Sequence, residues 1–239
     1  YHNGGGLQFD REGDLYLTLG DGGLLGDWRN RAQHLDILLG KILRIHPTPD
    51  EARAYEVPDD NPWIGFSDAA PEVWALGTRN PYRIDVGPDT GDVWVADVGL
   101  RCAEEVTRIA GGRGGANLGW HHREGGLAFV GGGPPDLLDP VYWYPHDPGC
   151  AVIGGAVYRG RRLPELEGSY LASDYCTGRI VALTPSGGDS SDGVSARDLG
   201  VESLAPLGIF RAPDGELWLT NQSGEVLELR PPGSTDLAE

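Results

Sequence analysis

Hydrophobic and polar residues alternate over short stretches of this chain, and turn-forming residues separate the stretches. Residues 9–18 read as a strand end, a tight turn and an alternating strand, and residues 86–97 and 210–220 repeat this order. In each copy Asp and Gly supply the turn, and an aromatic residue follows at a fixed strand position. A weaker copy covers residues 168–174 and is followed by a second strand over residues 178–183. The pattern predicts many short antiparallel strands.

The spacing of these copies indicates a repeated sheet. The turn acid is Asp14 in the first copy, Asp92 in the second and Glu216 in the third, so the copies are about two and about three units of a ~40-residue propeller blade apart. We therefore expect an all-β fold, a β-propeller, and 239 residues suffice for five blades or slightly more. Residues 1–230 are expected to form this single domain and residues 231–239 a frayed tail.

Helical periodicity is scarce. Residues 33–40 are compatible with one or two helical turns closed by Gly40, and residues 41–45 alternate as a strand. Neither a signal peptide nor a run of eighteen apolar residues is present, so no membrane span is expected. The chain opens in mid-motif without methionine, and we expect it to be a piece of a longer protein whose N-terminus lies upstream.

The charge composition of the chain argues against some classes of binding partner. The chain has 36 acidic and 19 basic side chains and a formal net charge of −17, which argues against a nucleic-acid or anionic-membrane surface. Its 38 glycines and 18 prolines approach the level of disordered chains, but 39% hydrophobic residues and seven tryptophans indicate a folded core. Glycine and proline are therefore expected in turns.

Three cysteines cannot all pair within the chain. Cys150 and Cys176 lie at the edges of two expected strands and are a plausible disulfide in an oxidising compartment, which leaves Cys102 unpaired. The alternative is three buried free thiols in a cytosolic protein.

Eight short motifs follow one another in a fixed order. They are YHNGGGLQF (1–9), TLGDGG (18–23), LLGKILRI (38–45), EVWALGTRNP (72–81), GDVWVADVG (91–99), EEV (104–106), GANLGW (115–120) and GGAVYRG (154–160). Together they resemble the glucose/sorbosone dehydrogenase family, the soluble quinoprotein sugar dehydrogenases, from Tyr1 to about Arg230. The resemblance implies a six-bladed β-propeller, of which the first blade or so is missing from this chain.

The same resemblance implies a site for pyrroloquinoline quinone. The histidine that matches His2 is the base that takes the sugar hydroxyl proton as hydride passes to the quinone, and neutral histidine suits that role. Arg79 and Asn80 match the pair that contacts the quinone, and Arg79 would also stabilise the charge that develops on the cofactor. The alternative for Arg79 is an ion pair with Asp85 or Asp97 on neighbouring strands.

Calcium sites are implied at two places. Gly99 and Leu100 match the loop whose backbone carbonyls hold the catalytic Ca²⁺, an ion that accepts backbone oxygens readily. Glu104 and Glu105 match acidic family positions, either as ligands or as solvated carboxylates on an exposed turn. A second ion could be bound by carboxylates of a glycine-rich loop, namely Asp21, Asp27 and Asp36.

Three positions depart from the family. Cys176 stands where the family has a lysine, and Ala205 and Leu207 stand where glucose-oxidising members have arginines that grip cofactor carboxylates. Arg179 or Arg211 would have to substitute, and we expect Arg179 to bind the cofactor.

The expected function is therefore that of a dehydrogenase that passes hydride from an aldose to Ca²⁺-bound quinone and then serves an external electron acceptor, in the periplasm or outside the cell. The alternative is a binding propeller of the same family that has lost the quinone site. A calcium-dependent lactone hydrolase is a weaker option that rests on fold analogy alone. A zinc site at His121, His122 and His146 is not expected, because adjacent residues of a strand face opposite sides.

Overall fold

The structure is a computed structural model, and it describes residues 1–23, 26–49, 52–186, 193–203 and 205–233. These residues form antiparallel sheets joined by loops, with three short 3-10 turns at Arg31–Gln33, Ala110–Gly112 and Pro164–Leu166. The all-β prediction is confirmed. No helix in the part of the chain that the structure describes is long and apolar enough to cross a membrane.

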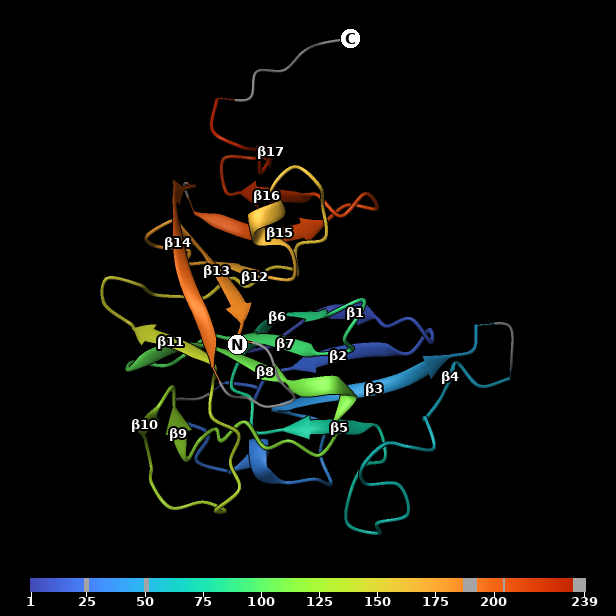
Figure 1. The fold of residues 1–239 in the computed structure, drawn as a ribbon. Helices are drawn as coiled ribbons and strands as arrows, with labels where there is room; N and C mark the ends of the chain where they lie inside the picture. The colour runs from blue at the N-terminus through green and yellow to red at the C-terminus, as the bar shows by residue number, and fades with distance from the viewer. Residues whose placement is uncertain (24–25, 50–51, 187–192, 204, 234–239) are drawn as a thin grey trace.

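The strands form four main sheets that follow one another along the chain (Figure 1). The first contains β1 (Leu7–Phe9), β2 (Leu15–Leu19), β3 (Lys41–Pro47), β4 (Tyr55–Glu56) and β5 (Val73–Leu76). The second contains β6 (Pro81–Val86), β7 (Val93–Asp97), β8 (Ala103–Ile109) and β11 (Tyr142–Pro145). The third contains β12 (Tyr170–Ser173), β13 (Arg179–Pro185) and β14 (Val194–Glu202), and the fourth β15 (Pro206–Arg211), β16 (Leu217–Asn221) and β17 (Val226–Glu228). A hairpin of β9 (Arg123–Glu124) and β10 (Leu127–Ala128) stands apart.

The sequence repeat is a structural repeat. Its aromatic residue occupies the same place in three sheets, because Tyr16 of β2 lies opposite Arg44 and Trp94 of β7 lies opposite Arg108. In the third copy Trp218 lies opposite Glu228. In the first two copies the facing guanidinium lies over the aromatic ring, at 6.0 and 5.9 Å from its centroid. The turn acid therefore starts an equivalent strand each time.

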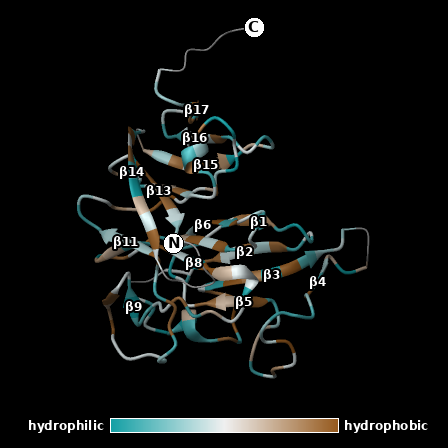
Figure 2. Ribbon diagram, viewed as in Figure 1, coloured by the Kyte–Doolittle hydropathy of each residue, from teal (hydrophilic) through white to brown (hydrophobic). Residues whose placement is uncertain are grey.

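Neighbouring sheets share their cores. One buried cluster joins the first and second sheets around Tyr16, Ile42, Trp74, Ile84 and Val95. A second joins the second and third sheets around Trp94, Val106, Tyr170 and Leu183, and a third joins the third and fourth sheets around Tyr158, Leu171, Ile180, Ile209 and Leu217. Hydrophobic residues concentrate in the strands and hydrophilic residues in the connecting loops (Figure 2). Stacked sheets with one core per neighbouring pair are what a propeller requires.

Some local predictions need correction. Of the residues 33–40 expected to form helical turns, only Gln33 is helical, as the last residue of the 3-10 turn Arg31–Gln33, although Gly40 does take the left-handed conformation at φ 70°. The last strand, β17, ends at Glu228, inside the expected domain of residues 1–230. Residues 234–239 of the expected tail lie outside the described residues. The domain boundary and the count of six blades stay predictions.

Candidate functional site

Three side chains from different segments meet at one end of the first two sheets. His2 precedes β1, Asp21 follows β2, and Arg79 lies between β5 and β6. The His2 Nδ1 atom is 2.7 Å from Asp21 Oδ1, and His2 Nε2 is 3.0 Å from Arg79 Nη2. The His2 side chain is 18% exposed and the Asp21 side chain 1%. The structure thus brings together both residues predicted to be catalytic.

These contacts fix the tautomer of His2. A guanidinium nitrogen can only donate, so His2 Nε2 must accept the hydrogen bond from Arg79 with its lone pair. The ring proton of neutral His2 then resides on Nδ1 and is donated to Asp21. His2 therefore presents an unprotonated Nε2 to the site.

Asp21 is held in place by two further contacts. Its Oδ1 atom also accepts the Gly23 N–H at 2.8 Å, and its Oδ2 atom accepts the Trp120 indole N–H at 2.9 Å. Burial by itself raises the pKa of Asp21, but the hydrogen bonds from His2, Gly23 and Trp120 outweigh burial and lower it. Asp21 is thus an ionised partner of His2.

Arg79 is buried with few acidic contacts. Its Nη1 atom donates to the carbonyl oxygens of Val98 and Gly99, both at 2.6 Å, and its guanidinium lies over the Trp120 ring at 5.6 Å. Its Nε atom is buried, and the described residues offer it no hydrogen-bond acceptor. Burial lowers the pKa of Arg79.

The alternative ion pairs of Arg79 are not formed by its side chain. Asp85 is bound by Arg211 at 2.9 Å, so that alternative is wrong. Asp97 instead accepts the backbone N–H groups of Arg79 and Asn80, at 2.8 and 2.6 Å. Burial raises the pKa of Asp97 to about 7. Asp97 therefore fixes the backbone that carries the predicted Arg79–Asn80 pair.

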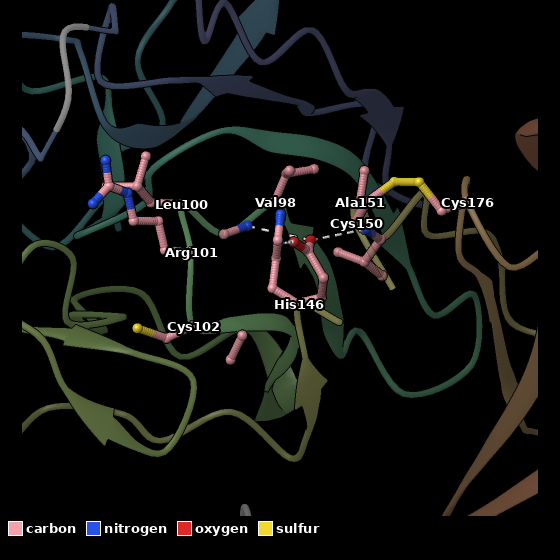
Figure 3. Close-up of polar contacts among 12 residues, drawn as sticks. Val98, Leu100, Arg101, Cys102, His146, Cys150, Ala151 and Cys176 are labelled. Atoms are coloured by element: carbon pink, nitrogen blue, oxygen red, sulfur yellow. Dashed lines mark hydrogen bonds and ion pairs between the residues drawn. A yellow bond between two sulfur atoms is a disulfide. The ribbon is translucent and has the colours of Figure 1, made fainter. Parts of the chain in front are cut away.

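Glu104 and Glu105 are not on an exposed turn. Both lie in β8, where they are 0% and 8% exposed. Glu104 Oε2 accepts the N–H groups of Gly99 and Val152, at 3.2 and 2.9 Å, and His146 Nδ1 lies 2.7 Å from Oε1 (Figure 3). Burial raises the pKa of Glu105 well above its ordinary range, with the Asp97 carboxylate adding to the effect. Donors from neighbouring loops satisfy Glu104.

The Glucose / Sorbosone dehydrogenase family description matches residues 1–228. The chain belongs to this family. It is 30% identical over 241 residues to the aldose sugar dehydrogenase YliI of Escherichia coli K12, covering 96% of this chain and 60% of that protein. It is 34% identical over 215 residues to the HIPL2 protein of Arabidopsis thaliana, covering 80% of this chain and 30% of that protein. A solved structure of glucose dehydrogenase superposes with a TM-score of 0.78 at 29% identity, over 97% of this chain and 65% of that one. The chain therefore spans between about a third and two thirds of the length of these relatives.

The two arginines that were expected to substitute for the basic residues of the family, Arg179 and Arg211, are both paired with aspartates. Cys176, at the lysine position, forms the predicted disulfide with Cys150, with 5.7 Å between their Cα atoms, and Cys102 is an exposed thiol (Figure 3). Arg179 is exposed and paired with Asp198 of β14. Because Arg211 is committed to Asp85, the contacts found in the described residues give neither arginine a place beside His2.

The carboxylates expected to hold a second ion are separated. Asp21 is committed to His2, whereas Asp27 binds the Ala32 N–H at 2.8 Å and Arg31 Nε at 3.3 Å. Among the residues described, no group of three or more His, Cys, Asp and Glu side chains is arranged to hold a metal ion. The carbonyl oxygens of Gly99 and Leu100 belong to the backbone and not to such a group, so the calcium site at these residues stays a prediction.

Two residues of this family member were missed by sequence reasoning. Trp120 holds Asp21 and covers Arg79, and its presence in a family motif was the available signal. Glu124 binds the loop that carries Gly99 and Leu100, and nothing in its sequence neighbourhood indicates this contact.

Lys41, the sole lysine, anchors the loop that carries Asp21 and Asp27. It is fully buried, and its Nζ atom donates to the carbonyl oxygens of Arg31, Ala32 and Leu39, at 2.9, 3.0 and 2.8 Å. Burial lowers the pKa of Lys41 to about 8.

This shift predicts that the contribution of Lys41 to stability grows between pH 8 and pH 10.5. At Lys41 the unfolded chain, with a lysine pKa of 10.5, binds more protons than the folded chain in this window, so the contribution of this residue to the free energy of unfolding rises with pH there. The contribution of Lys41 is on the order of 3 kcal/mol across the window. Urea unfolding at several pH values measures it, and Lys41→Met should lose this slope. Equal slopes in both proteins would contradict the prediction.

Proposed function

We propose that this chain carries the active site of a dehydrogenase that oxidises an aldose, with pyrroloquinoline quinone and Ca²⁺ as cofactors. The observation that carries the proposal is the position of His2 between Asp21 and Arg79, whose guanidinium needs an acceptor at Nε2. Family membership supplies the reaction class, and the similar E. coli protein is named an aldose sugar dehydrogenase.

His2 is the base in this proposal. Its Nε2 lone pair accepts the proton of the sugar hydroxyl, and the positive charge then formed on the ring is stabilised by Asp21 through Nδ1. Arg79 has to give up its hydrogen bond to Nε2 when the hydroxyl arrives, and its freed Nη2 can then bind a substrate or cofactor oxygen. His2, Asp21 and Arg79 therefore orient the reacting hydroxyl and remove its proton.

The residues present fit an anionic quinone together with a cation. Arg79 has a buried Nε donor that lacks an acceptor within the described part of the chain, and it supplies positive charge where negative charge develops. Asp97, Glu104 and Glu124 add negative charge around Arg79, so a tricarboxylate needs a further positive charge to bind there. When bound, the quinone would accept the two electrons and the hydrogen taken from the sugar carbon.

Backbone oxygens of the loop after β7 would hold the cation. Carbonyl oxygens are ligands that Ca²⁺ prefers, and the Gly99 oxygen already faces the site, where Arg79 donates to it. The Cys150–Cys176 disulfide supports an oxidising compartment, the periplasm or the cell exterior. We also propose that the full-length protein forms a complete six-bladed ring and passes its electrons to an external acceptor.

A binding protein of the same family is the second candidate. It is favoured by the basic positions, since Cys176 is locked in a disulfide and both candidate substitutes, Arg179 and Arg211, are paired with aspartates. Charge-assisted contacts of this kind contribute roughly 1.5–3 kcal/mol each, and their loss would weaken quinone binding by orders of magnitude.

The test uses the chain within its full-length protein. Ca²⁺ and pyrroloquinoline quinone are added to the apoprotein, quinone binding is followed by absorbance, and aldoses are then supplied with a dye acceptor. Saturable binding at micromolar quinone and aldose-dependent dye reduction are expected. No saturable quinone binding would favour the second candidate. Quinone binding without dye reduction would contradict the proposed dehydrogenase activity.

A further inference from the structure

The Glu124 carboxylate binds the backbone of residues 98–102, the loop between β7 and β8. Its Oε1 atom accepts the backbone N–H groups of Leu100, Arg101 and Cys102, at 2.5, 2.7 and 2.9 Å. Three successive N–H groups that converge on one carboxylate oxygen form an anion-binding concavity of the backbone. Glu124 itself is 3% exposed and comes from β9, outside the sheet that carries the loop.

These contacts decide where the carbonyl oxygens of the loop point. In a trans peptide the C=O of one residue points away from the N–H of the next. Because the N–H groups of Leu100 and Arg101 face Glu124, the carbonyl oxygens of Gly99 and Leu100 face the opposite side. The Gly99 oxygen confirms this direction, since it lies 2.6 Å from Arg79 Nη1 in the candidate site.

Two further observations concern Gly99 and Glu124. A Cβ atom at Gly99 would lie 1.8 Å from the Ala103 carbonyl oxygen and 2.8 Å from Glu124 Oε1, so only glycine allows this approach. The second carboxylate oxygen of Glu124, Oε2, is buried and has no hydrogen-bond partner in the described ranges. A buried carboxylate oxygen without a donor is costly, and a cation bound nearby would offset that cost electrostatically.

We propose that Glu124 is a positioning residue that turns the Gly99 and Leu100 carbonyl oxygens toward the bound cation. Glu124 does not itself bind the ion. Its carboxylate fixes the peptide planes from the side opposite these oxygens. Its negative charge would also favour a cation bound by the loop. This inference rests on the proposed function, because it needs the cation site at the loop to exist.

The test compares Glu124→Gln with a matched control, Glu216→Gln. Glu216 is also a buried glutamate of this chain, 4% exposed, and its Oε1 atom also accepts successive backbone N–H groups, those of Arg161 and Arg162 at 2.8 and 3.1 Å. Both variants therefore lose a carboxylate that holds a loop, but only one of the loops contains Gly99. Ca²⁺ alone is titrated into each apoprotein by calorimetry, quinone is then added at saturating Ca²⁺, and the free energy of unfolding is measured in parallel.

Glu124→Gln is expected to weaken Ca²⁺ binding by about 10–100-fold, the range for residues that orient metal ligands, while Glu216→Gln stays within about twofold of wild type. Unchanged Ca²⁺ affinity in Glu124→Gln, or equal weakening in both variants, would overturn the inference. If Glu124→Gln does not fold, amide hydrogen exchange of the wild type decides, since the amides of Leu100, Arg101 and Cys102 must then exchange as slowly as those of a strand.

Failure of the inference and failure of the proposed function give different results. A wild type that binds Ca²⁺ but no quinone overturns the proposed function, and the comparison of the two variants still decides the role of Glu124. A wild type that oxidises aldoses without binding Ca²⁺ overturns the role of Glu124 and leaves that of His2 intact.

Discussion

Replacing His2 with glutamine is expected to lower the rate of aldose oxidation by about 10²–10⁴-fold, the usual contribution of a positioned general base. Glutamine is similar in size and can still bind Asp21 and Arg79 by hydrogen bonds, but its side chain cannot take up a proton at neutral pH. The measurement is dye reduction by the quinone-loaded protein at saturating aldose.

The Asp21→Asn variant tests whether Asp21 fixes the tautomer of His2. The amide of asparagine can donate to His2 Nδ1, which would favour the tautomer with the proton on Nε2 and so remove the lone pair from the site. Both variants should bind quinone as the wild type does, and Asp21→Asn should unfold at a lower urea concentration than His2→Gln because its amide NH₂ group cannot accept the hydrogen bonds of Gly23 or Trp120. A His2→Gln protein that turns over at the wild-type rate would show that another group takes the proton.

Removing the Asp92 carboxylate is expected to cost about 3–5 kcal/mol of unfolding free energy, as for other buried ion pairs that lose one partner. Arg108 Nη2 lies 2.7 Å from Asp92, and the two side chains are 9% and 6% exposed. In Asp92→Ala the guanidinium stays buried without this partner, and the Gly111 N–H loses its acceptor as well.

The repeat offers an internal control for this prediction. Asp14 makes the equivalent contact to Arg44 at 2.7 Å, but Arg44 also binds the exposed Asp60 at 2.9 Å. Asp14→Ala should therefore cost less than Asp92→Ala, because Arg44 keeps an acidic partner. Urea unfolding of both variants measures the difference, and equal losses would contradict the assignment of the cost to an unpaired buried charge.

The fold was predictable to the extent that it is local. Turn chemistry and the aromatic position defined the repeat, but the register of Tyr16 opposite Arg44 and Trp94 opposite Arg108 was not predicted, because it depends on the strand that follows each repeat. The number of blades and the end of the domain depend on how sheets close against one another, which no local pattern encodes.

The site was predictable only where a motif carried it. His2 and Arg79 were found in this way, but Asp21 was expected to bind metal and instead holds His2, because spacing does not reveal which donors a carboxylate meets. Glu104 was expected either to bind metal or to be solvated on an exposed turn, yet N–H groups from two loops satisfy it in a buried strand. Glu124 was missed because the groups it binds are main-chain amides, which every sequence has.

The distribution of reactive groups has a practical consequence for attaching this protein to an electrode or a dye. The amine of Lys41 is buried under three carbonyl acceptors, so acylating reagents aimed at lysine find no accessible side chain in the folded protein. The thiol of Cys102, by contrast, is exposed, and its sulfur points away from the disulfide in Figure 3. Within this chain a maleimide would therefore attach at Cys102, three residues along the chain from Gly99, and a probe placed there would report directly on the loop that faces Arg79.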